Sequence, residues 1–491
     1  MTSDDSALKG EKIEQEKNKF EKNRQNKLSR IKESGVDPYG QRFADTISVA
    51  QARGRYKETD PPQRARCAGR IVLLRDIGKL IFITLRDSSG SIQIGLSKKL
   101  IAGRWQLAKL LELADIIGVD GQLGKTKTGE ITIWCDSVVL LSKSLKQPPE
   151  KFHGLANPDL RYRQRYVDLW ANPEVMARFQ KRSDIIAHIR KFLRQQGFME
   201  VETPMMQPSA GGAAARPFTT HHNSLDMDLF LRIAPELFLK RLLVGGMEKV
   251  FEINRNFRNE GLSRQHNPEF TMLELYQAYA DYNVMMDLTE DLIGLLVQQY
   301  CSGDKVEFNG DEIDFTRPWR RATYSELLTE YAGCDINDTT AVRKKAKKLE
   351  LPQADMDDVV VVNRVFEATV ENNLVNPTFV TDYPAALCPL TKQKKDNPQY
   401  AERFELFIGR MEIANAYTEL NDPAVQEENF HIQLRGQQES MAKMDDDFIN
   451  ALKYAMPPAG GLGIGIDRLI MVLTGAASIR DVILFPLLRP C

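Results

Sequence analysis

The sequence predicts an α+β protein with two different parts. Between residues 64 and 143, apolar and polar side chains alternate with a period of two, which is typical of strands that bury one face. From about residue 160 onward, amphipathic stretches of helical period alternate with short strand-type runs. A hydrophobic content of 42% in 491 residues is enough to bury a sizeable core.

Charge and cysteine content exclude several classes of protein. The 66 Lys and Arg residues against 67 Asp and Glu give a net charge of -1, which excludes a uniformly basic protein that coats nucleic acid. The six cysteines lie far apart, so we expect reduced thiols and neither a disulfide framework nor a zinc site. No apolar run approaches the roughly 20 residues that cross a bilayer, and the first ten residues are polar and acidic. We therefore expect a cytoplasmic protein without a membrane segment.

Residues 1–60 are expected to form a charged helical extension. Residues 10–33 are dense in Lys, Glu, Asn and Gln, and their few apolar side chains fit one helical stripe of Ile13, Phe20, Leu28 and Ile31. The pattern favours a solvated helix that packs on a neighbouring domain. A basic arm that contacts nucleic-acid phosphate is the alternative, but glutamates are interleaved with the lysines.

Residues 61–145 are expected to form a five-stranded β-domain. Strand-type runs cover 66–75, 80–87, 91–96, 116–123 and 131–141. A helical stretch over 105–113 lies between the third and fourth runs, as in an OB-type barrel, whose open face commonly binds single-stranded nucleic acid. A generic five-stranded domain fits the pattern equally well.

Residues 146–160 predict a linker, and residues 161–491 predict a large domain with a helical insertion around 320–375. The large domain begins with a helix over 174–196 and a strand over 198–203 that ends at Pro204. Further strands are expected at 229–232, 249–254 and 269–280, with a helix over 236–244 after the first of them.

Two polar segments of this domain are candidates for binding phosphate and metal. In the first, residues 251–270, a strand leads into a polar loop that contains Gly261. Arg258 lies near the end of this strand and can bind a phosphate with its planar guanidinium group. In the second, Glu405, Glu412 and Glu419 are spaced seven residues apart, and the first two can face each other across a hairpin and share Mg²⁺. The alternatives are an exposed turn with ion pairs and a helical face with surface glutamates. The clustered polar residues weaken the former, and the strand-like runs weaken the latter.

A third segment, residues 457–469, is rich in glycine and contains Arg468. It lacks the third glycine of a dinucleotide-binding fingerprint, and the chain has no G-K-[ST] of a P-loop. The glycines and the following helix suggest a nucleotide that lies against the backbone with an arginine nearby. A helix-packing glycine cluster is the alternative.

The long helix and strand ending at Pro204, the Arg258 segment and the Arg468 segment resemble the three signature motifs of class II aminoacyl-tRNA synthetases. Residues 151–166, 211–218, 232–237 and 415–423 resemble the lysyl-tRNA synthetase family, and the resemblance extends from about residue 28 to 490. It implies an OB-type anticodon-binding barrel and a class II catalytic domain built on an antiparallel sheet flanked by helices. It also implies a homodimer formed through the helix over 174–196.

The same resemblance implies a function and cofactors. The family activates L-lysine with ATP to lysyl-adenylate and transfers it to the 3′ end of tRNA(Lys), with about two to three Mg²⁺ ions bound with ATP. No protein nucleophile is needed, because positioning and charge neutralisation suffice for in-line attack on the α-phosphorus.

The resemblance also assigns site residues by position. The ATP-binding residues are Arg258, Glu260, His266, Asn267, Phe270, Glu405 and Arg468, of which Arg258 and Arg468 are the catalytic ones. The lysine-binding residues are Gly212, Glu236, Glu274, Tyr276, Asn415, Tyr417 and Glu419. The metal ligands are Glu405 and Glu412, and the anticodon-binding residues are Arg75, Phe82 and Gln93. The alternative for Phe82 is an ordinary residue of the barrel core.

Lysine carries two ammonium groups, so we expect a pocket that is rich in carboxylates and has no side-chain cation directed at the substrate's side chain. The three assigned glutamates fit lysine and disfavour aspartate or asparagine. A ligase that attaches lysine to a translation factor is a second possibility, but that family lacks the barrel. A catalytically inactive RNA-binding paralogue is a third, and the presence of Arg258, Glu405, Glu412 and Arg468 argues against it.

Overall fold

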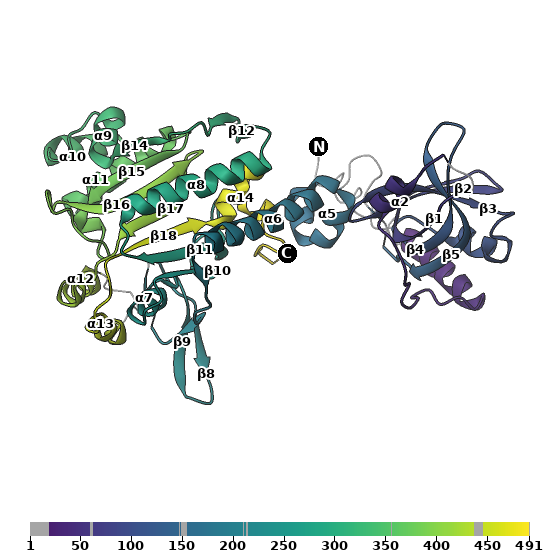
Figure 1. The fold of residues 1–491 in the computed structure, drawn as a ribbon, viewed down its shortest axis with the longest axis horizontal. Coiled ribbons are helices and arrows are strands. Elements are labelled where there is room, and N and C mark those ends of the chain that lie inside the picture. Colours follow the sequence, from purple (N-terminus) through teal and green to yellow (C-terminus); the bar gives the residue numbers. More distant parts are fainter. Residues whose placement is uncertain are drawn as a thin grey trace, which may run out of the picture. The chain divides into compact units, whose positions relative to one another are not determined.

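The chain divides into two compact units (Figure 1), residues 1–156 with 170–172 and residues 157–169 with 173–491. The computed structural model describes residues 19–58, 62–146, 148, 155–209, 211–212, 215–354, 356–436 and 445–490. Within these ranges, no helix combines the length and the apolar character needed to cross a membrane. The predicted linker over 146–160 lies partly outside the described residues, and the predicted domain limits stay predictions.

The first unit is built around a closed five-stranded barrel. Its strands are β1 (Arg64–Asp76), β2 (Leu80–Asp87), β3 (Gly90–Ser97), β4 (Ile116–Lys125) and β5 (Ile131–Ser142). They close in the order β1-β2-β3-β5-β4, and η1 (Ala102–Arg104) and helix α3 (Trp105–Leu110) connect β3 to β4. Along β2, Ile81, Ile83 and Leu85 are buried while the residues between them are partly exposed. The structure therefore confirms the strands and the helix predicted for this region.

The N-terminal segment packs on this barrel. Residues 19–33 form a helix, and Ile31 belongs to the barrel core while Leu28 is buried. The buried guanidinium group of Arg24 donates to the carbonyl oxygens of Leu113 and Ser144 at 3.1 and 3.0 Å. These contacts support the packing interpretation for the described part of the helix. Ile13 lies outside the described residues. A second helix, α2 (Val49–Arg55), begins at a capping box and also packs on the barrel.

The second unit contains an eight-stranded sheet with the order β14-β15-β16-β17-β18-β11-β10-β6. The strands are β6 (Met199–Glu200), β10 (Lys249–Phe257), β11 (Glu269–Ala278), β14 (Arg320–Thr323), β15 (Thr378–Pro384), β16 (Tyr400–Ile408), β17 (Met411–Thr418) and β18 (Ala459–Gly465). The inner six strands pair antiparallel, and the two edge strands pair parallel with their neighbours. The predicted antiparallel sheet is therefore present, with one parallel strand added at each edge.

Helices cover one face of this sheet and form the main core with it. They are α6 (Pro173–Gln195), α8 (Tyr282–Tyr300) and α14 (Ile466–Thr474), and α8 runs across the strands in Figure 1. Leu273 and Leu275 of β11 and Leu462 and Ile464 of β18 point into this core. The side chains between them point to the opposite face, which is therefore available for a site.

The remaining elements of the second unit surround the sheet. They are α4 (Pro158–Arg163), α5 (Arg165–Ala171), β7 (Met206–Gln207), β8 (Thr219–His222), β9 (Met227–Leu231), α7 (Glu236–Val244), β12 (Lys305–Phe308), β13 (Asp311–Asp314), η4 (Ala385–Leu387), α12 (Pro423–Gly436), α13 (Asp446–Leu452) and η5 (Ile479–Asp481). The predicted helical insertion is built from α9 (Tyr324–Leu327), η2 (Leu328–Ala332), α10 (Thr339–Lys348), α11 (Asp358–Thr369) and η3 (Glu371–Asn373). It has its own core, in which Tyr324 stacks on Phe366 with ring centroids 3.9 Å apart.

Two elements differ from the prediction. The strand expected over 198–203 is only the two-residue edge strand β6, which pairs with β10 alone. The glycine-rich segment, for which glycines leading into a helix were predicted and no strand, contains the central strand β18. Glycine is depleted in strands, and hence composition concealed this one.

Candidate active site

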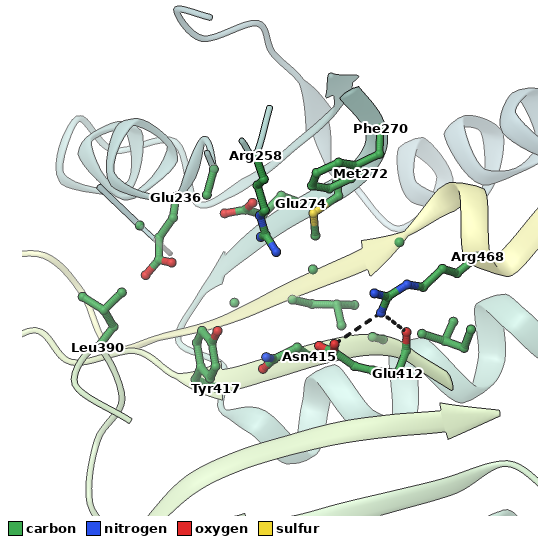
Figure 2. Close-up of a pocket in the computed structure, with 18 of the residues that line it drawn as sticks. Glu236, Arg258, Phe270, Met272, Glu274, Leu390, Glu412, Asn415, Tyr417 and Arg468 are labelled. Carbon is green, nitrogen blue, oxygen red and sulfur yellow. Dashed lines mark hydrogen bonds and ion pairs between the residues drawn. The ribbon is translucent and has the colours of Figure 1, made fainter. Parts of the chain in front are cut away.

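A cavity of about 470 Å³ lies on the sheet face opposite the helical core. It is lined by residues of β11, β17, β18 and α7, by the loop that follows β10, and by the first turn of α14. Figure 2 shows Glu236 toward one end of this cavity and Arg468 toward the other, with Arg258 beside Glu274. Most of the residues predicted from sequence to bind lysine and ATP therefore line one space, but Glu405 and Glu419 are not among those that line it.

Strand alternation places many of these side chains. On β11 every second residue lines the cavity, namely Phe270, Met272, Glu274 and Tyr276. On β17 the corresponding residues are Asn415 and Tyr417, and on the intervening strand β18 they are Gly461, Gly463 and Gly465. A side chain at Gly461 is impossible without rearrangement, because its Cβ would lie 2.0 Å from Oε1 of Glu419. The glycines therefore leave the floor of the cavity open to a ligand.

Arg258 follows the end of β10 and is a cation without a counterion in the described structure. Its guanidinium carbon lies 5.2 Å from the centroid of the Phe270 ring. Its buried Nε has no hydrogen-bond partner among the described residues, although a buried donor normally has one. Such a donor at a cavity wall is suited to an anionic ligand.

Arg468 lies in the first turn of α14 and is held by polar contacts. It donates to the Glu412 carbonyl oxygen at 2.8 Å and to Nε2 of His266 at 2.9 Å. Partial burial and the charge of Arg468 lower the pKa of His266, so the imidazole is neutral and accepts this bond. The preceding residue, Asp467, accepts from the Thr271 amide at 2.7 Å and pairs with Arg182 at 2.6 Å. Helix α14 is thereby fixed to β11.

The other predicted nucleotide-site residues lie beside these two arginines. Glu260 is exposed at the cavity edge, and Asn267 is buried in its wall. Asn267 donates to the Glu269 carbonyl oxygen at 2.6 Å, and its Oδ1 has no partner among the described residues. Gln265 also lines the cavity. This end of the cavity is cationic and retains unused donors and acceptors.

The opposite end holds three carboxyl groups on three different elements. Glu236 begins α7, Glu274 is on β11, and Glu419 directly follows β17. The Glu274 carboxylate accepts from the Tyr276 hydroxyl at 2.7 Å. Burial, and to a smaller extent the negative charges of Glu236 and Glu419, raise the pKa of Glu274 to about 8, although the hydrogen bond from Tyr276 acts in the opposite direction. These charges act on one another, so the three groups converge as the sequence predicts.

A fourth charged group at this end differs from the expectation. The ammonium group of Lys240, fully buried in α7, lies 2.5 Å from Glu236 Oε1 and also forms an ion pair with Glu419. The prediction that the pocket would have no side-chain cation did not anticipate it. Glu419 and Lys240 are not among the residues that line the described cavity, so both lie behind its wall. Oε1 of Glu419 has no hydrogen-bond partner in the described structure and lies against Gly461, which does line the cavity.

The predicted role of Gly212 depends on a backbone that only glycine adopts easily. Gly212 has a φ of +85°, and a Cβ there would lie 3.1 Å from the Cβ of Glu236. Gly212 lines the cavity beside this carboxylate, so its backbone can approach a ligand closely.

The two predicted metal ligands lie on neighbouring strands. Glu405 is on β16 and Glu412 on β17, where their partners across the hairpin are Asn415 and Phe407. Burial raises the pKa of Glu405, its ion pair with Arg403 lowers it, and the negative charge of Glu412 raises it. No described cluster of three or more His, Cys, Asp or Glu residues could cage a metal. Two nearby carboxylates fit Mg²⁺, which usually binds through one or two carboxylates and substrate phosphates.

The predicted anticodon residues lie together on the barrel. Arg75 of β1 pairs with Phe82 of β2, and Gln93 of β3 pairs with Thr84 of β2. Phe82 is half-buried on the outer side of its strand and is not part of the barrel core. Its ring packs edge-on against Trp134, with centroids 6.0 Å apart. The barrel-core alternative for Phe82 is therefore wrong.

Sequence reasoning missed Lys240, Arg403 and Trp134. Lys240 is four residues after Glu236 on a predicted helix, a spacing that brings the two side chains together and was the available signal. Arg403 is two residues before Glu405 on a strand, and therefore on the same face. Trp134 had no local signal, because its contact with Phe82 depends on barrel closure.

Comparison with known proteins agrees with this geometry. Residues 157–489 match the family of tRNA synthetases class II (D, K and N), and residues 65–141 match the OB-fold nucleic acid binding domain. The lysine–tRNA ligase of Carboxydothermus hydrogenoformans is 52% identical over 484 residues, which cover 97% of this chain and 99% of that protein. The lysine–tRNA ligase of Pelotomaculum thermopropionicum is 51% identical over 487 residues, covering 97% and 96% of the two chains. That of Clostridium tetani is 46% identical over 502 residues, covering 100% and 99%. With a cavity lined by the Arg258 and Arg468 segments and a family match over two thirds of its length, the chain belongs to the class II tRNA synthetases of the D, K and N group.

Proposed function

We propose that this chain activates L-lysine with ATP and transfers the lysyl group to the 3′ end of tRNA(Lys). The observation that carries the proposal is the convergence of Glu236, Glu274 and Glu419 at one end of a cavity whose other end holds Arg258 and Arg468. A dication and a polyphosphate are the ligands that these two ends suit. The lysine–tRNA ligases that match nearly the whole chain support the same substrate.

The first step joins two bound substrates. A carboxylate oxygen of lysine attacks the α-phosphorus of ATP, the bond to the bridging oxygen breaks, and pyrophosphate leaves with the electron pair. Arg258 is proposed to hold the α-phosphate and Arg468 the γ-phosphate, with the adenine between Phe270 and Arg468. The protein then acts by positioning and by charge stabilisation, which are the main contributions in phosphoryl transfer.

The lysine end is proposed to recognise both ammonium groups. Glu419 accepts from the side-chain ammonium, and Glu236, Glu274 and the Gly212 carbonyl take part in binding the rest of the substrate together with Tyr276, Asn415 and Tyr417. A neutral analogue would leave a buried carboxylate without a partner, which costs affinity strongly. Aspartate and asparagine are disfavoured for the same reason.

Glu405 and Glu412 are the residues that would hold Mg²⁺, and about two to three ions with ATP are expected from the family resemblance. The metal, when bound, supplies positive charge to the phosphates. Glu405 is itself held by Arg403 and by the Tyr383 hydroxyl at 2.7 Å, so its carboxylate has a fixed position.

The second step transfers the lysyl group to RNA. The terminal ribose hydroxyl of the tRNA attacks the carbonyl carbon of the adenylate, and AMP leaves. The barrel supports an RNA acceptor over a protein acceptor, since Phe82, Arg75 and Gln93 form a partly exposed aromatic and polar surface that suits unpaired bases.

Assembly and location complete the proposal. A homodimer is expected through α6 and the edge strand β6, where Met199 is 55% exposed. The cytoplasm is the expected location of the reaction.

The test is ATP–pyrophosphate exchange with each of the twenty amino acids, followed by charging of total tRNA. Lysine alone should support exchange, and lysine should be the amino acid that the enzyme attaches to tRNA. Exchange with aspartate or asparagine, or with no amino acid at all, would contradict the proposal.

A further inference from the structure

Lys240 is the most completely buried cation near the cavity. Its side chain has 0% exposure, and those of its partners Glu236 and Glu419 have 5% and 0%. Burying an ammonium group is costly unless it is paired and hydrogen-bonded. Lys240 contacts both carboxylates, so the three groups form one ion-paired cluster that exists before any ligand binds.

The position of this cluster separates it from an ordinary surface ion pair. Glu236 lines the cavity, whereas Lys240 and Glu419 lie behind its wall in the described structure. Gly461, which lines the cavity, has no side chain, and the unpartnered Oε1 of Glu419 lies against it. One oxygen of Glu419 is paired with Lys240, and the other can still accept a hydrogen bond from a ligand.

The charges at this end can be counted. Glu236, Glu274 and Glu419 carry up to three negative charges, and Lys240 contributes one positive charge. With lysine bound and all three carboxyl groups ionised, the group as a whole therefore carries two negative charges. A lysine substrate brings two ammonium groups to this end, while its carboxylate is directed at the α-phosphate that Arg258 is proposed to hold. The match depends on Lys240, because without it the site would have one negative charge too many.

We infer that Lys240 is a positioning residue of the amino-acid subsite, which holds the carboxylates of Glu236 and Glu419 in place and reduces three negative charges to the two that a lysine dication neutralises. It does not touch the substrate. It acts through Glu419, whose free oxygen it orients, and through Glu236, whose carboxylate it keeps at the cavity wall. The inference rests on the proposed function, since it concerns how that site selects lysine.

Three variants test it. Lys240→Met keeps the length of the side chain without its charge. Lys240→Ala leaves room for n-propylammonium, which has the atoms of the missing side chain beyond Cβ, and propan-1-ol is its neutral control. Glu236→Gln with Lys240→Met removes both partners of one pair and restores the count of two negative charges. KM and kcat for lysine, and KM for ATP, are measured by pyrophosphate exchange, and folding is followed by thermal unfolding.

Lys240→Met should raise KM for lysine at least about tenfold while KM for ATP changes less than about twofold, because the arginine end is untouched. Adding n-propylammonium to Lys240→Ala should lower KM for lysine again, and propan-1-ol should not. The wild-type enzyme with the same amine corrects for competition at the substrate site. The double variant should bind lysine better than Lys240→Met alone.

A Lys240→Met variant that folds and keeps the wild-type KM for lysine would overturn the inference. If that variant does not fold, the experiment with Lys240→Ala tests the inference instead. Equal effects of n-propylammonium and propan-1-ol on its KM for lysine would overturn the inference. Wild-type enzyme without lysine-dependent exchange would instead refute the proposed function, and the inference with it. The two failures are therefore distinguishable.

Discussion

The two ends of the cavity treat buried charge in opposite ways. At the lysine end, the carboxylates of Glu236 and Glu419 already have a partner in Lys240, and Glu274 has the Tyr276 hydroxyl. At the nucleotide end, Arg258 has no counterion among the described residues, and Arg468 has a neutral imidazole and a carbonyl oxygen as its nearest partners. Figure 2 shows Glu236 and Glu274 of the first set and Arg258 and Arg468 of the second around the same space.

This difference in pairing indicates which ligand each end of the cavity can bind. Three carboxyl groups with no cation nearby would protonate, so a resident ammonium is needed before the substrate arrives. Arginine remains charged in any protein environment and tolerates the lack of a partner better. The arginines of the nucleotide end can therefore stay charged until the phosphates bind. The negative charge of the lysine end must be partly neutralised before the substrate binds.

The largest effect should come from Arg258, which has no counterion among the described residues, whereas Arg468 pairs with the Glu412 carboxylate at 3.4 Å. Arg258→Ala should reduce the rate of pyrophosphate exchange roughly 100- to 1,000-fold, because a preorganised charge aimed at the reacting phosphate is lost. Thermal stability should change little, since the described guanidinium group has no ionic partner to leave behind. Arg258→Lys should recover only part of the rate, because an ammonium group lacks the planar fork. Full activity in Arg258→Ala would show that this end does not act on phosphate.

At the lysine end, Glu419→Gln should impair lysine more than ATP. We expect KM for lysine to rise roughly 100-fold, because a charged hydrogen bond to the side-chain ammonium becomes a neutral one, while KM for ATP changes less than about twofold. Pyrophosphate exchange at varied lysine and ATP measures both. Glu428→Gln, at an exposed position of α12, is the matched control. Unchanged lysine-dependent exchange in Glu419→Gln would defeat the pocket assignment.

The pH dependence should also distinguish the two ends. In the empty site the pKa of Glu274 is raised to about 8, so the carboxyl is protonated and neutral below that pH. An ammonium ligand prefers the ionised form, and hence lysine should bind more tightly as the pH rises toward 8. We expect KM for lysine to fall roughly tenfold between pH 6.5 and 8, with a much smaller change in KM for ATP. Titration calorimetry in two buffers should detect proton release on lysine binding, and Glu274→Gln should reduce it without abolishing it, because burial also raises the pKa of Glu419 to about 8.

The contrast between the ends also explains what could be predicted from sequence. The family resemblance assigned Glu274, Tyr276, Asn415 and Tyr417 to the lysine site, and alternation along β11 and β17 explains why these cavity-lining side chains share a face. The barrel strands, in contrast, were predicted from alternation itself. These features depend on local periodicity, which a sequence displays directly.

Features that depend on distant contacts were harder to predict. Glu419 lies behind the wall because Gly461, on another strand, leaves room for its carboxylate, and no local pattern encodes that neighbour. Strand β18 was missed as a strand because its cavity-facing positions are glycines, chosen for space and against strand propensity. The site thus departs from local rules where the ligand has to fit.

The smallest effect should come from a substitution in the barrel, because it leaves the cavity intact. Phe82→Ala should lower kcat/KM for tRNA charging roughly fivefold, because one base would lose a stacking partner, and pyrophosphate exchange should be unchanged. Phe82→Tyr keeps the ring and should behave as wild type. Because Phe82 is half-buried against Trp134 and lies outside the barrel core, its loss should cost RNA contact more than stability. Equal losses in charging and exchange would instead mean that the ring supports the fold, and a fall in the thermal unfolding temperature of Phe82→Ala would accompany them.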